Sequence, residues 1–419
     1  MARKPRVVVL GGGFAGLESA FYLRHKLQDR VDITLISDSN YFVFKPNSIY
    51  VPFGEDPEKL RIDLNEPTRR KHIDFIRAKA ERIDPTKSLV HLPHMEVAFD
   101  YLIVATGAAM RPAEVPGLQE NAVTIWTTDD MIQLRERYAG LVEAARAGKR
   151  SKILFLIPPN NRCPGPLYEM ALMTDTWFRE QGVRDNVEIA WSTFEDRYAQ
   201  AFGPRLDPVM HEEFETRGIH GHKGYPVERV EPGRVMYAGG KSLPFDLLVA
   251  FPPHVAANRF LTLPTDDRGF IKVDPDSRRV QGYERIFAVG DAADFPVKQA
   301  FLALLQADAA AEHLAADILQ VDPEIDFHPM NIYVMEQLDK ATFTQVPLRY
   351  TIDPAKPVTV DLEDEDHYKV GVSPVWRAGK KFVGVYLPWR FGHGEPFHAG
   401  LGWDAMKLGL KVMSKVMAR

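Results

Sequence analysis

A run of apolar residues near the start of the chain leads directly into a glycine-rich turn, and no other feature constrains the fold as strongly. The run spans residues 6–10, the turn reads G-G-G-F-A-G over residues 11–16, and a helical pattern follows. In the pattern G-x-G-x-x-G, Gly11 permits a tight strand-to-helix turn, Gly13 lets a pyrophosphate approach the backbone, and Gly16 lets the helix pack on the strand. The free N–H groups at the start of the helix bind such an anion. The sequence therefore predicts a strand–turn–helix unit that binds a dinucleotide.

The next predicted strand, residues 31–37, supports this interpretation because it follows the glycine motif at the expected distance of about twenty residues. Such a strand usually ends in an acid that binds the ribose hydroxyls. Ser37 occupies that place here, and Asp38 follows it. A serine hydroxyl also bonds to a ribose hydroxyl, so this departure from the standard pattern leaves the prediction in place.

The composition narrows the class of protein. With 419 residues, two or three domains are expected, and a net charge of −5 gives no reason to expect nucleic acid as a partner. The single cysteine, Cys163, allows neither an intramolecular disulfide nor a cysteine metal cluster, and no metal site is predicted. The first strand begins too early for a signal peptide, and no apolar run is long enough to span a membrane. We expect a cytoplasmic protein whose membrane contact is at most peripheral.

Two later strands also end in small residues. Residues 100–105 lead into Thr106-Gly107, and residues 285–289 lead into Gly290-Asp291. Small residues at these ends let the backbone approach a ligand or a crossing strand. A Gly-Asp pair is by itself equally typical of a capped helix start, and an alanine-rich helix is predicted over residues 301–319.

In this order and at these separations, the three landmarks resemble the flavoprotein family with two dinucleotide-binding domains, over residues 1 to about 320. The resemblance implies an α/β fold with two Rossmann-like domains, and FAD with its pyrophosphate on the glycine motif. It also implies that the strand ending in Thr106 crosses near the cofactor and that Asp291 binds the ribityl chain. The implied cofactor contacts are Gly11, Gly13, Phe14, Ala15, Gly16, Ser37, Asp38, Lys45, Pro46, Ala80, Ala105, Thr106, Gly107, Gly290, Asp291 and Lys298.

The same pattern predicts the domain boundaries. We expect the FAD-binding domain at residues 1–112 and 246–320, the second Rossmann-like domain at 113–245, and a C-terminal segment facing a membrane and a quinone at 321–419. Smaller elements are predicted as well: strands at 75–80, 89–92, 341–344 and 381–386, and a helix within 55–72.

The second Rossmann-like domain is expected to lack a nicotinamide site. Its first strand, residues 151–157, is followed by a loop with four prolines and no G-x-G-x-x-G. Proline has no N–H for a phosphate, and its ring blocks close approach. The next strand, residues 187–192, also lacks a terminal acid for the ribose. NAD(P)H binding is therefore not predicted.

The loop that replaces the nicotinamide site carries a motif of its own. Residues 163–169, C-P-G-P-L-Y-E, resemble the Cys-x-Gly-Pro-x-Tyr-Glu motif of sulfide:quinone oxidoreductases and of the flavin subunit of flavocytochrome c sulfide dehydrogenase. Residues 174–179 and 185–187 continue the likeness, and residues 41–46 look like the flavin-side loop of those enzymes. The resemblance implies that Cys163 lies on the reaction face of the flavin.

Cys163 has two interpretations. A lone cysteine is often a small buried hydrophobic residue. Here it stands beside Arg162 at the start of a helix, and both features lower a thiol pKa. The sequence therefore favours a reactive thiolate.

The chain departs from this family at two positions. Its enzymes use a second and often a third redox cysteine, and Trp126 and Tyr333 stand where those would fall. Neither a bridge of sulfur atoms between cysteines nor a covalent link to the flavin can form, so FAD is expected to be non-covalent. A single thiolate still takes up one sulfur as a persulfide, whose release then needs an external thiol.

Two further residues are candidates for catalysis. Glu169, on the helix after Cys163, is placed to relay protons to the flavin or to a quinone, or is simply a first-turn acid that stabilises the helix. Lys298 is placed to stabilise the negative charge of reduced flavin, or is an ordinary surface lysine.

The C-terminal segment suggests a quinone and a membrane surface. Tyr333, Trp389, Phe391 and Phe397 are candidate quinone contacts, with His393 or His398 as proton donors. A final helix is predicted over residues 401–417, with Lys407, Lys411 and Lys415 beside a broad apolar face. Such a helix suits an anionic membrane interface, and equally a helix docked on the core or on a second subunit.

Together these features predict an FAD-dependent oxidoreductase that resembles sulfide:quinone oxidoreductase. It would pass electrons from sulfide or another small sulfur reductant to a quinone, at the inner face of the cell membrane, either as a monomer or as a homo-oligomer. One alternative is a type II NADH:quinone oxidoreductase, against which the proline-rich loop argues. The other is an inactive flavin-binding regulatory protein.

Overall fold

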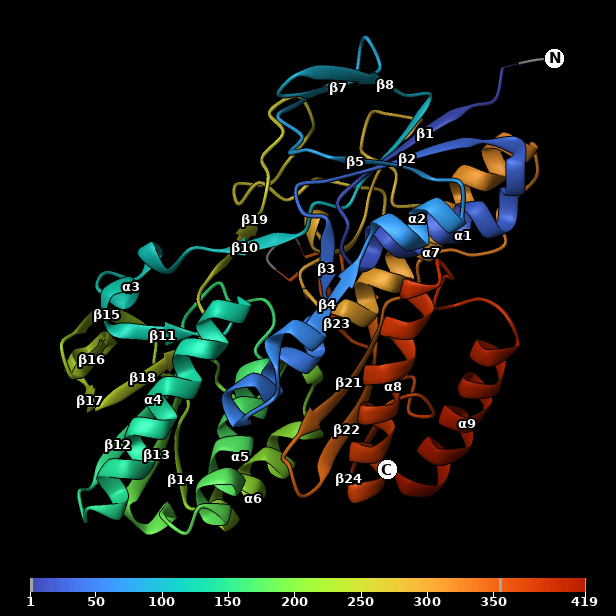
Figure 1. Ribbon diagram of the computed structural model, residues 1–419. Helices are drawn as coiled ribbons and strands as arrows, with labels where there is room; N and C mark the ends of the chain where they lie inside the picture. The colour runs from blue at the N-terminus through green and yellow to red at the C-terminus, as the bar shows by residue number, and fades with distance from the viewer. Residues whose placement is uncertain (1–2, 354–355, 419) are drawn as a thin grey trace.

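The computed structural model describes residues 3–353 and 356–418, and some side chains of the last helix lie outside that description. The chain forms two parallel sheets, each with its own helices, and a C-terminal antiparallel sheet with two helices. Figure 1 shows the first sheet at the top, the second at the lower left and the C-terminal elements at the lower right.

The first parallel sheet has the strand order β20-β9-β1-β2-β5. Its strands are β1 Arg6–Leu10, β2 Asp32–Ser37, β5 Asp74–Arg77, β9 Tyr101–Val104 and β20 Ile286–Ala288. Val7 and Val9 face helices α1 (Phe14–Leu27) and α7 (Ala300–Leu319). Val8 and Leu10 point to the other face, which is covered by the antiparallel strands β6 Arg82–Asp84, β7 Leu89–Leu92 and β8 Met95–Ala98. Burial on both faces explains why β1 is apolar throughout rather than alternating.

The second parallel sheet has the order β11-β18-β12-β13-β14. Its strands are β11 Ala122–Thr124, β12 Ser151–Ile157, β13 Val187–Thr193, β14 Ile219–His222 and β18 Leu247–Ala250. Its helices are α4 Thr128–Arg146, α5 Gly165–Glu180 and α6 Leu206–Arg217, and a small sheet of β15 Val227–Glu231, β16 Arg234–Tyr237 and β17 Ser242–Pro244 packs beside it. Because β18 pairs with β12, this sheet extends past residue 245, where the sequence analysis placed the boundary.

The chain passes between the two parallel sheets twice, and the two crossings pair with each other. Strand β10 (Ala108–Met110) leaves the first sheet, and β19 (His254–Ala256) returns to it. They form an antiparallel ribbon in which Met110 stands opposite His254.

The C-terminal sheet is antiparallel, and its strands are β21 Met330–Glu336, β22 Ala341–Tyr350, β23 Val358–Val360 and β24 Lys369–Ser373. It is followed by helices α8 Pro374–Gly392 and α9 Leu401–Met417. The strand expected at residues 381–386 is wrong, because these residues lie in the middle of α8. Ser373 caps that helix by accepting the Val375 N–H at 3.1 Å, and Pro374 occupies its first turn.

The helix expected within residues 55–72 is only partly correct. A turn of 3₁₀-helix at Pro57–Leu60 is followed by strand β4 (Arg61–Asp63), which pairs with β3 (Tyr41–Val43), and only α2 (Asn65–Arg70) is an α-helix. The charged residues of this segment therefore lie on three short elements.

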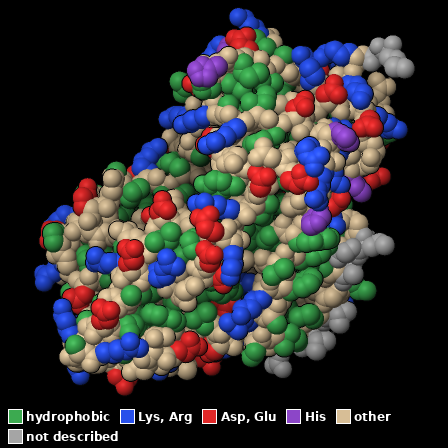
Figure 2. All heavy atoms as spheres, in the orientation of Figure 1, with side chains coloured by type: hydrophobic (Ala, Val, Ile, Leu, Met, Phe, Trp, Pro, Cys, Tyr) green, Lys and Arg blue, Asp and Glu red, His purple; other side chains and the backbone are tan. Residues whose placement is uncertain are grey.

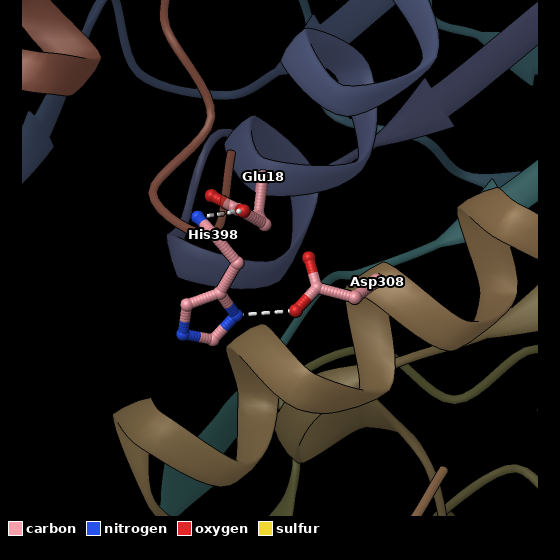
Figure 3. A group of neighbouring side chains, drawn as sticks. All are labelled: Glu18, Asp308 and His398. Atoms are coloured by element: carbon pink, nitrogen blue, oxygen red, sulfur yellow. Dashed lines mark hydrogen bonds and ion pairs between the residues drawn. The ribbon is translucent and has the colours of Figure 1, made fainter. Parts of the chain in front are cut away.

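A buried group of three side chains attaches the α8–α9 loop to the first domain (Figure 3). Glu18 of α1 accepts the backbone N–H groups of Phe397 and His398 at 2.6 and 3.0 Å, and the His398 ring bonds to Asp308 of α7. Burial raises the pKa of both Glu18 and Asp308 to about 8 and lowers the pKa of His398 to about 4. Near neutral pH the carboxyl groups of Glu18 and Asp308 are therefore mostly protonated, and the His398 imidazole is neutral.

Helix α8 exposes an apolar stripe, and α9 lies beside α8 (Figure 1). Val375, Phe382, Val385 and Trp389 are exposed on α8, with Val385 at 71%. In Figure 2, hydrophobic side chains lie over α8 beside the grey residues. Lys407 and Lys415 are exposed on α9, while the Lys411 side chain lies outside the described residues. Across the described parts of the chain, none of the helices has the length and apolar character needed to cross a membrane.

Candidate functional site

A large cavity of about 940 Å³ lies where the three parts of the molecule meet. This volume is at the upper end of the range for ligand sites, about 300–1,000 Å³. Its walls come from the glycine turn after β1, the ends of β2, β9 and β20, the loop before α5, and the inner faces of β21, α8 and α9. The cavity thus gathers segments that are distant in the sequence.

The glycine motif has the geometry of a phosphate-binding turn. Gly11 has φ +111°, and a Cβ there would lie 2.3 Å from the Ala105 carbonyl oxygen. A Cβ on Gly16 would lie 1.8 Å from the Gly11 carbonyl oxygen, so α1 packs directly on the turn. Gly13 caps α1 and has open space where a side chain would stand. A phosphate can therefore reach the first N–H groups of α1.

Most of the other predicted cofactor contacts also line this cavity. They are Phe14, Ala15, Ser37, Asp38, Lys45, Pro46, Ala80, Ala105, Thr106, Gly107, Gly290, Asp291 and Lys298. Ser37 ends β2, as the sequence pattern indicated, and is nearly buried. Gly16 contributes through packing on the turn rather than through the cavity wall.

Three charged residues, Asp291, Lys298 and Lys45, line the cavity. Burial raises the pKa of Asp291, and Lys298 and Lys45 oppose that rise. Burial lowers the pKa of Lys298 to about 7 and that of Lys45 to about 8. Lys298 is 2% exposed and donates to the Ala293 carbonyl oxygen, so it is not an ordinary surface lysine. A flavin ring with developing negative charge would have these two cations available.

Cys163 faces the cavity from the loop before α5. Its backbone N–H donates to the Asn161 side chain at 2.9 Å, and its thiol is partly exposed to the cavity. Burial among protein atoms, together with Asp291 and Glu169, raises the pKa of this thiol. The expectation of a low thiol pKa is therefore wrong, because burial, and after it the charges of Asp291 and Glu169, outweighs Arg162 and the helix start.

Glu169 is part of a buried polar network that sequence reasoning only half identified. Tyr333 of β21 donates to its carboxylate at 2.6 Å, the Glu336 backbone N–H donates at 2.7 Å, and Lys380 of α8 also donates to it. Burial raises the pKa of Glu169, and Lys380 is the main opposing influence. All but Glu336 line the cavity. The sequence analysis did not identify Lys380, because it expected a strand at residues 381–386 and nothing in the local sequence indicated a contact with Glu169.

The network continues away from the cavity. Glu336 accepts a hydrogen bond from the Tyr50 hydroxyl at 2.6 Å and another from Arg377 at 2.8 Å. Because Glu336 is completely buried, these two donors compensate its charge. A chain of ionisable groups therefore runs from the cavity wall into the C-terminal sheet.

The aromatic residues proposed for a quinone separate into two groups. Tyr333 and Phe397 line the cavity. Phe391 is 0% exposed and packs against Phe21 and Phe42, and Trp389 is half exposed on the outer side of α8. Trp389 and Phe391 are not among the residues that line the cavity, and their role as quinone contacts stays an untested prediction. His393 is exposed beside Trp389, and His398 belongs to the group that holds the loop.

Comparison with known proteins identifies the fold family. A family model described as pyridine nucleotide-disulphide oxidoreductase matches residues 5–146 and 176–312, more than half of the chain. The chain belongs to this family. Membership implies FAD, and the glycine turn, Ser37 and the open space at Gly13 fit such a dinucleotide. Within the family, the chain is an FAD-dependent oxidoreductase of the branch that resembles sulfide:quinone reductase.

Individual relatives support the assignment to that branch. The sulfide-quinone reductase of Aquifex aeolicus is 31% identical over 237 residues, which cover 55% of this chain and 53% of the relative. The match thus spans about half the length of that protein. The mitochondrial sulfide:quinone oxidoreductase of Dictyostelium discoideum is 23% identical over 71% of this chain and 68% of its own. The solved structure of the Aquifex aeolicus enzyme superposes with a TM-score of 0.84, covering 97% of this chain and 96% of that chain at 22% identity.

Proposed function

We propose that this oxidoreductase takes electrons from a small anionic sulfur compound, hydrosulfide in the simplest case, and passes them through non-covalent FAD to a quinone. One observation carries the proposal. Cys163 and the Glu169–Tyr333–Lys380 network line the same cavity as the dinucleotide-binding residues. A sulfur nucleophile and a proton donor are therefore both next to the expected flavin.

Cys163 is the site of sulfur chemistry in this proposal. Hydrosulfide and the Cys163 thiol form a sulfur–sulfur bond and together lose two electrons and one proton, which leaves a persulfide on Cys163. FAD, when bound against the residues of the glycine turn, would be the two-electron oxidant for this step and, once reduced, the reductant for the quinone. A second thiolate takes the outer sulfur and leaves the Cys163 thiolate, which regains its proton. One cysteine in the protein suffices, because the thiolate that accepts the sulfur comes from an external molecule.

Glu169 delivers a proton to the quinone. The quinone needs two protons in all, and a carboxyl whose pKa is raised by burial keeps its proton to a higher pH than an ordinary glutamate does. Lys380 and Tyr333 hold the carboxyl in place and stabilise its anion after transfer. Lys45 and Lys298 line the same cavity and provide positive charge there.

The C-terminal helices give the quinone a route from a lipid surface. Phe382 and Val383 of α8 and Met406, Leu410 and Met413 of α9 line the cavity, and the stripe on α8 continues the apolar surface outward. A quinone with an isoprenoid tail would enter between the two helices. Contact of this face with the inner surface of the cell membrane is part of the proposal.

The test is an anaerobic reduction of the holoprotein. Sulfide should bleach the flavin absorbance and a short-chain quinone should restore it, whereas NADH and NADPH should leave the spectrum unchanged. Bleaching by NADH at a rate near that with sulfide would favour a type II NADH:quinone oxidoreductase and overturn the proposal. Flavin reduced by neither compound would favour a regulatory flavoprotein.

A further inference from the structure

His254 is a buried residue that the sulfur chemistry above does not use. It begins β19, in the ribbon that links the two parallel sheets, and it is 0% exposed. Its ring packs against Trp126 and Phe251, with centroids 5.8 and 5.3 Å away. His254, Trp126 and Cys163 all line the large cavity.

The hydrogen bonds of His254 fix which ring nitrogen carries the proton. The Arg162 backbone N–H donates to Nδ1 at 3.2 Å. A backbone N–H can only donate, so Nδ1 is the unprotonated nitrogen and the neutral ring carries its hydrogen on Nε2. Burial, followed by the charges of Lys298, Arg162, Lys45 and Arg268, lowers the pKa of His254 well below its ordinary value, so the ring stays neutral.

The Nε2–H group has no acceptor among the described residues, although it is buried. A buried donor without an acceptor is unfavourable, and native proteins rarely keep one unless a water, an ion or a ligand supplies the partner. Its surroundings indicate the charge of that partner. Lys45, Lys298 and Arg162 lie near the ring, and the Lys45 ammonium stands 3.1 Å from the centroid of the Trp126 ring. An anion that accepts a hydrogen bond suits this position.

The location of His254 indicates the chemical class of the anion. The ring contacts Trp126, which stands at the place of the early redox cysteine in the related enzymes, and Nδ1 binds the amide next to Cys163. His254 therefore bridges two positions associated with sulfur chemistry. The space on this side of the ring is bounded by aromatic rings, so a small, soft anion fits better than a strongly hydrated one.

We propose that the Nε2–H of His254 binds the anionic sulfur substrate, hydrosulfide or the terminal sulfur of a small persulfide, and presents it to Cys163. The assignment rests on the function proposed above. It makes His254 a substrate-binding residue that compensates for the missing second cysteine by holding the incoming sulfur through a hydrogen bond instead of a covalent bond.

The experiment compares three variants of the FAD-loaded, full-length protein. His254→Phe keeps a ring but removes the donor, and His254→Gln keeps an N–H that can reach the cavity. His222→Phe is the matched control, because His222 is a partly buried histidine of β14 away from the cavity. Each protein is titrated with thiocyanate, a non-reducing sulfur anion, through the change in flavin absorbance. Each is then reduced anaerobically with sulfide at increasing concentrations.

Loss of the donor should weaken thiocyanate binding and raise the half-saturating sulfide concentration by about tenfold or more, the effect of one hydrogen bond to a charged group. The limiting reduction rate should change by less than about threefold, since the chemistry at Cys163 remains. His254→Gln should recover most of the affinity, and His222→Phe should match the wild type.

Three outcomes overturn the assignment. Unchanged thiocyanate and sulfide affinities in His254→Phe with full FAD occupancy would exclude His254 from the substrate site. A shift in flavin potential or FAD affinity without a change in anion binding would make His254 a flavin contact instead. Loss of affinity in His254→Gln equal to that in His254→Phe would indicate a packing role. Thiocyanate binding is read without turnover, so it tests His254 even if sulfide does not reduce the wild-type flavin.

Discussion

Tyr333 donates a hydrogen bond of 2.6 Å to the Glu169 carboxylate, and this bond joins β21 to α5 beside the cavity. Tyr333 stands where the resemblance to sulfide:quinone oxidoreductases places a redox cysteine, and Glu169 lies six residues after Cys163. A position associated with sulfur chemistry therefore holds a proton-bearing group in this chain. At this position the cavity wall therefore carries the hydrogen-bonded pair Tyr333–Glu169, which is suited to moving protons.

Glu169→Gln should separate the two halves of the reaction. Without an ionisable carboxyl, reoxidation of the flavin by quinone should slow by about 100-fold, the usual contribution of a general acid. Reduction by sulfide should not slow, because loss of the Glu169 charge removes one of the influences that raise the pKa of the Cys163 thiol. Double-mixing stopped-flow absorbance measures both rates. Glu195→Gln is the matched control, because Glu195 is also buried but bonds to Tyr168 and Thr193 away from the cavity.

The pH profile gives Glu169 a second test. Because burial raises the pKa of Glu169, the wild-type rate of quinone reduction should be constant at low pH and should fall as the pH rises through that raised value. The Glu169→Gln profile should lack this fall. Identical profiles in the two proteins would remove Glu169 from the proton path.

Cys163→Ser should keep FAD and lose most of its reduction by sulfide, by about 100-fold or more, because serine is a poor sulfur nucleophile at neutral pH. In the wild type, the raised pKa of the Cys163 thiol predicts a rate that increases with pH, since the thiolate becomes more abundant. Dithionite, which needs no thiol, is the control and should reduce both proteins alike. A mutant as fast as the wild type with sulfide would show that Cys163 is a packing residue.

FAD should be bound without a covalent bond, one molecule per chain. Trp126 occupies the position at which a cysteine would attach the flavin, and Lys45 covers its ring. Acid precipitation of the yellow protein should release all of the flavin into the supernatant, where fluorescence identifies it as FAD. Flavin that remains with the pellet would contradict the expectation.

The group formed by Glu18, Asp308 and His398 should make stability fall as the pH rises toward about 8. Both carboxyls have folded pKa values of about 8 and unfolded values of about 4, so their contribution is complete below about pH 4, falls steadily between these values and is lost once the pH has passed about 8. The slope approaches about 1.4 kcal/mol per pH unit for each proton that the folded state retains. The His398 pKa of about 4 acts in the opposite direction, and its contribution is lost as the pH falls from about 6.5.

Urea unfolding of the holoprotein between pH 6.5 and 8.5 measures this dependence. The double variant Glu18→Gln, Asp308→Asn should show a flatter profile than the wild type, because its amides do not ionise. Glu212→Gln, at an exposed carboxyl on α6, is the control and should keep the wild-type slope. Parallel profiles for the double variant and the wild type would show that the buried group does not retain protons.

The apolar stripe on α8 should bind lipid. Replacing Phe382, Val385 and Trp389 with serine should lower the partition coefficient on anionic vesicles by at least about tenfold, since each side chain loses contact with hydrocarbon. Co-sedimentation at low and high salt measures it. Serine at Leu261, Ile352 and Leu362 is the matched control, because these residues are also exposed and apolar but lie on loops elsewhere. Equal loss in both triple variants would argue against α8 as the membrane face.

Local signals explain what could be predicted from the sequence. The glycine turn, β12 and α7 follow from short-range patterns, because glycine conformation and apolar periodicity depend on neighbouring residues. Residues 381–386 were misassigned since a short apolar run fits a strand or a buried helix equally well, although Ser373-Pro374 was an available start signal. Lys380 and His254 could not be found, because their roles depend on contacts with segments far along the chain.

The β10–β19 ribbon has a mechanical consequence. The chain crosses between the two parallel sheets only where Met110 pairs with His254 and where Ala108 pairs with Ala256, as far as the described residues show. Any rotation of one sheet relative to the other must therefore twist or break this short ladder. The amide protons of residues 108–110 should exchange slowly in the resting protein, and their exchange rate reports how often the cavity between the domains opens.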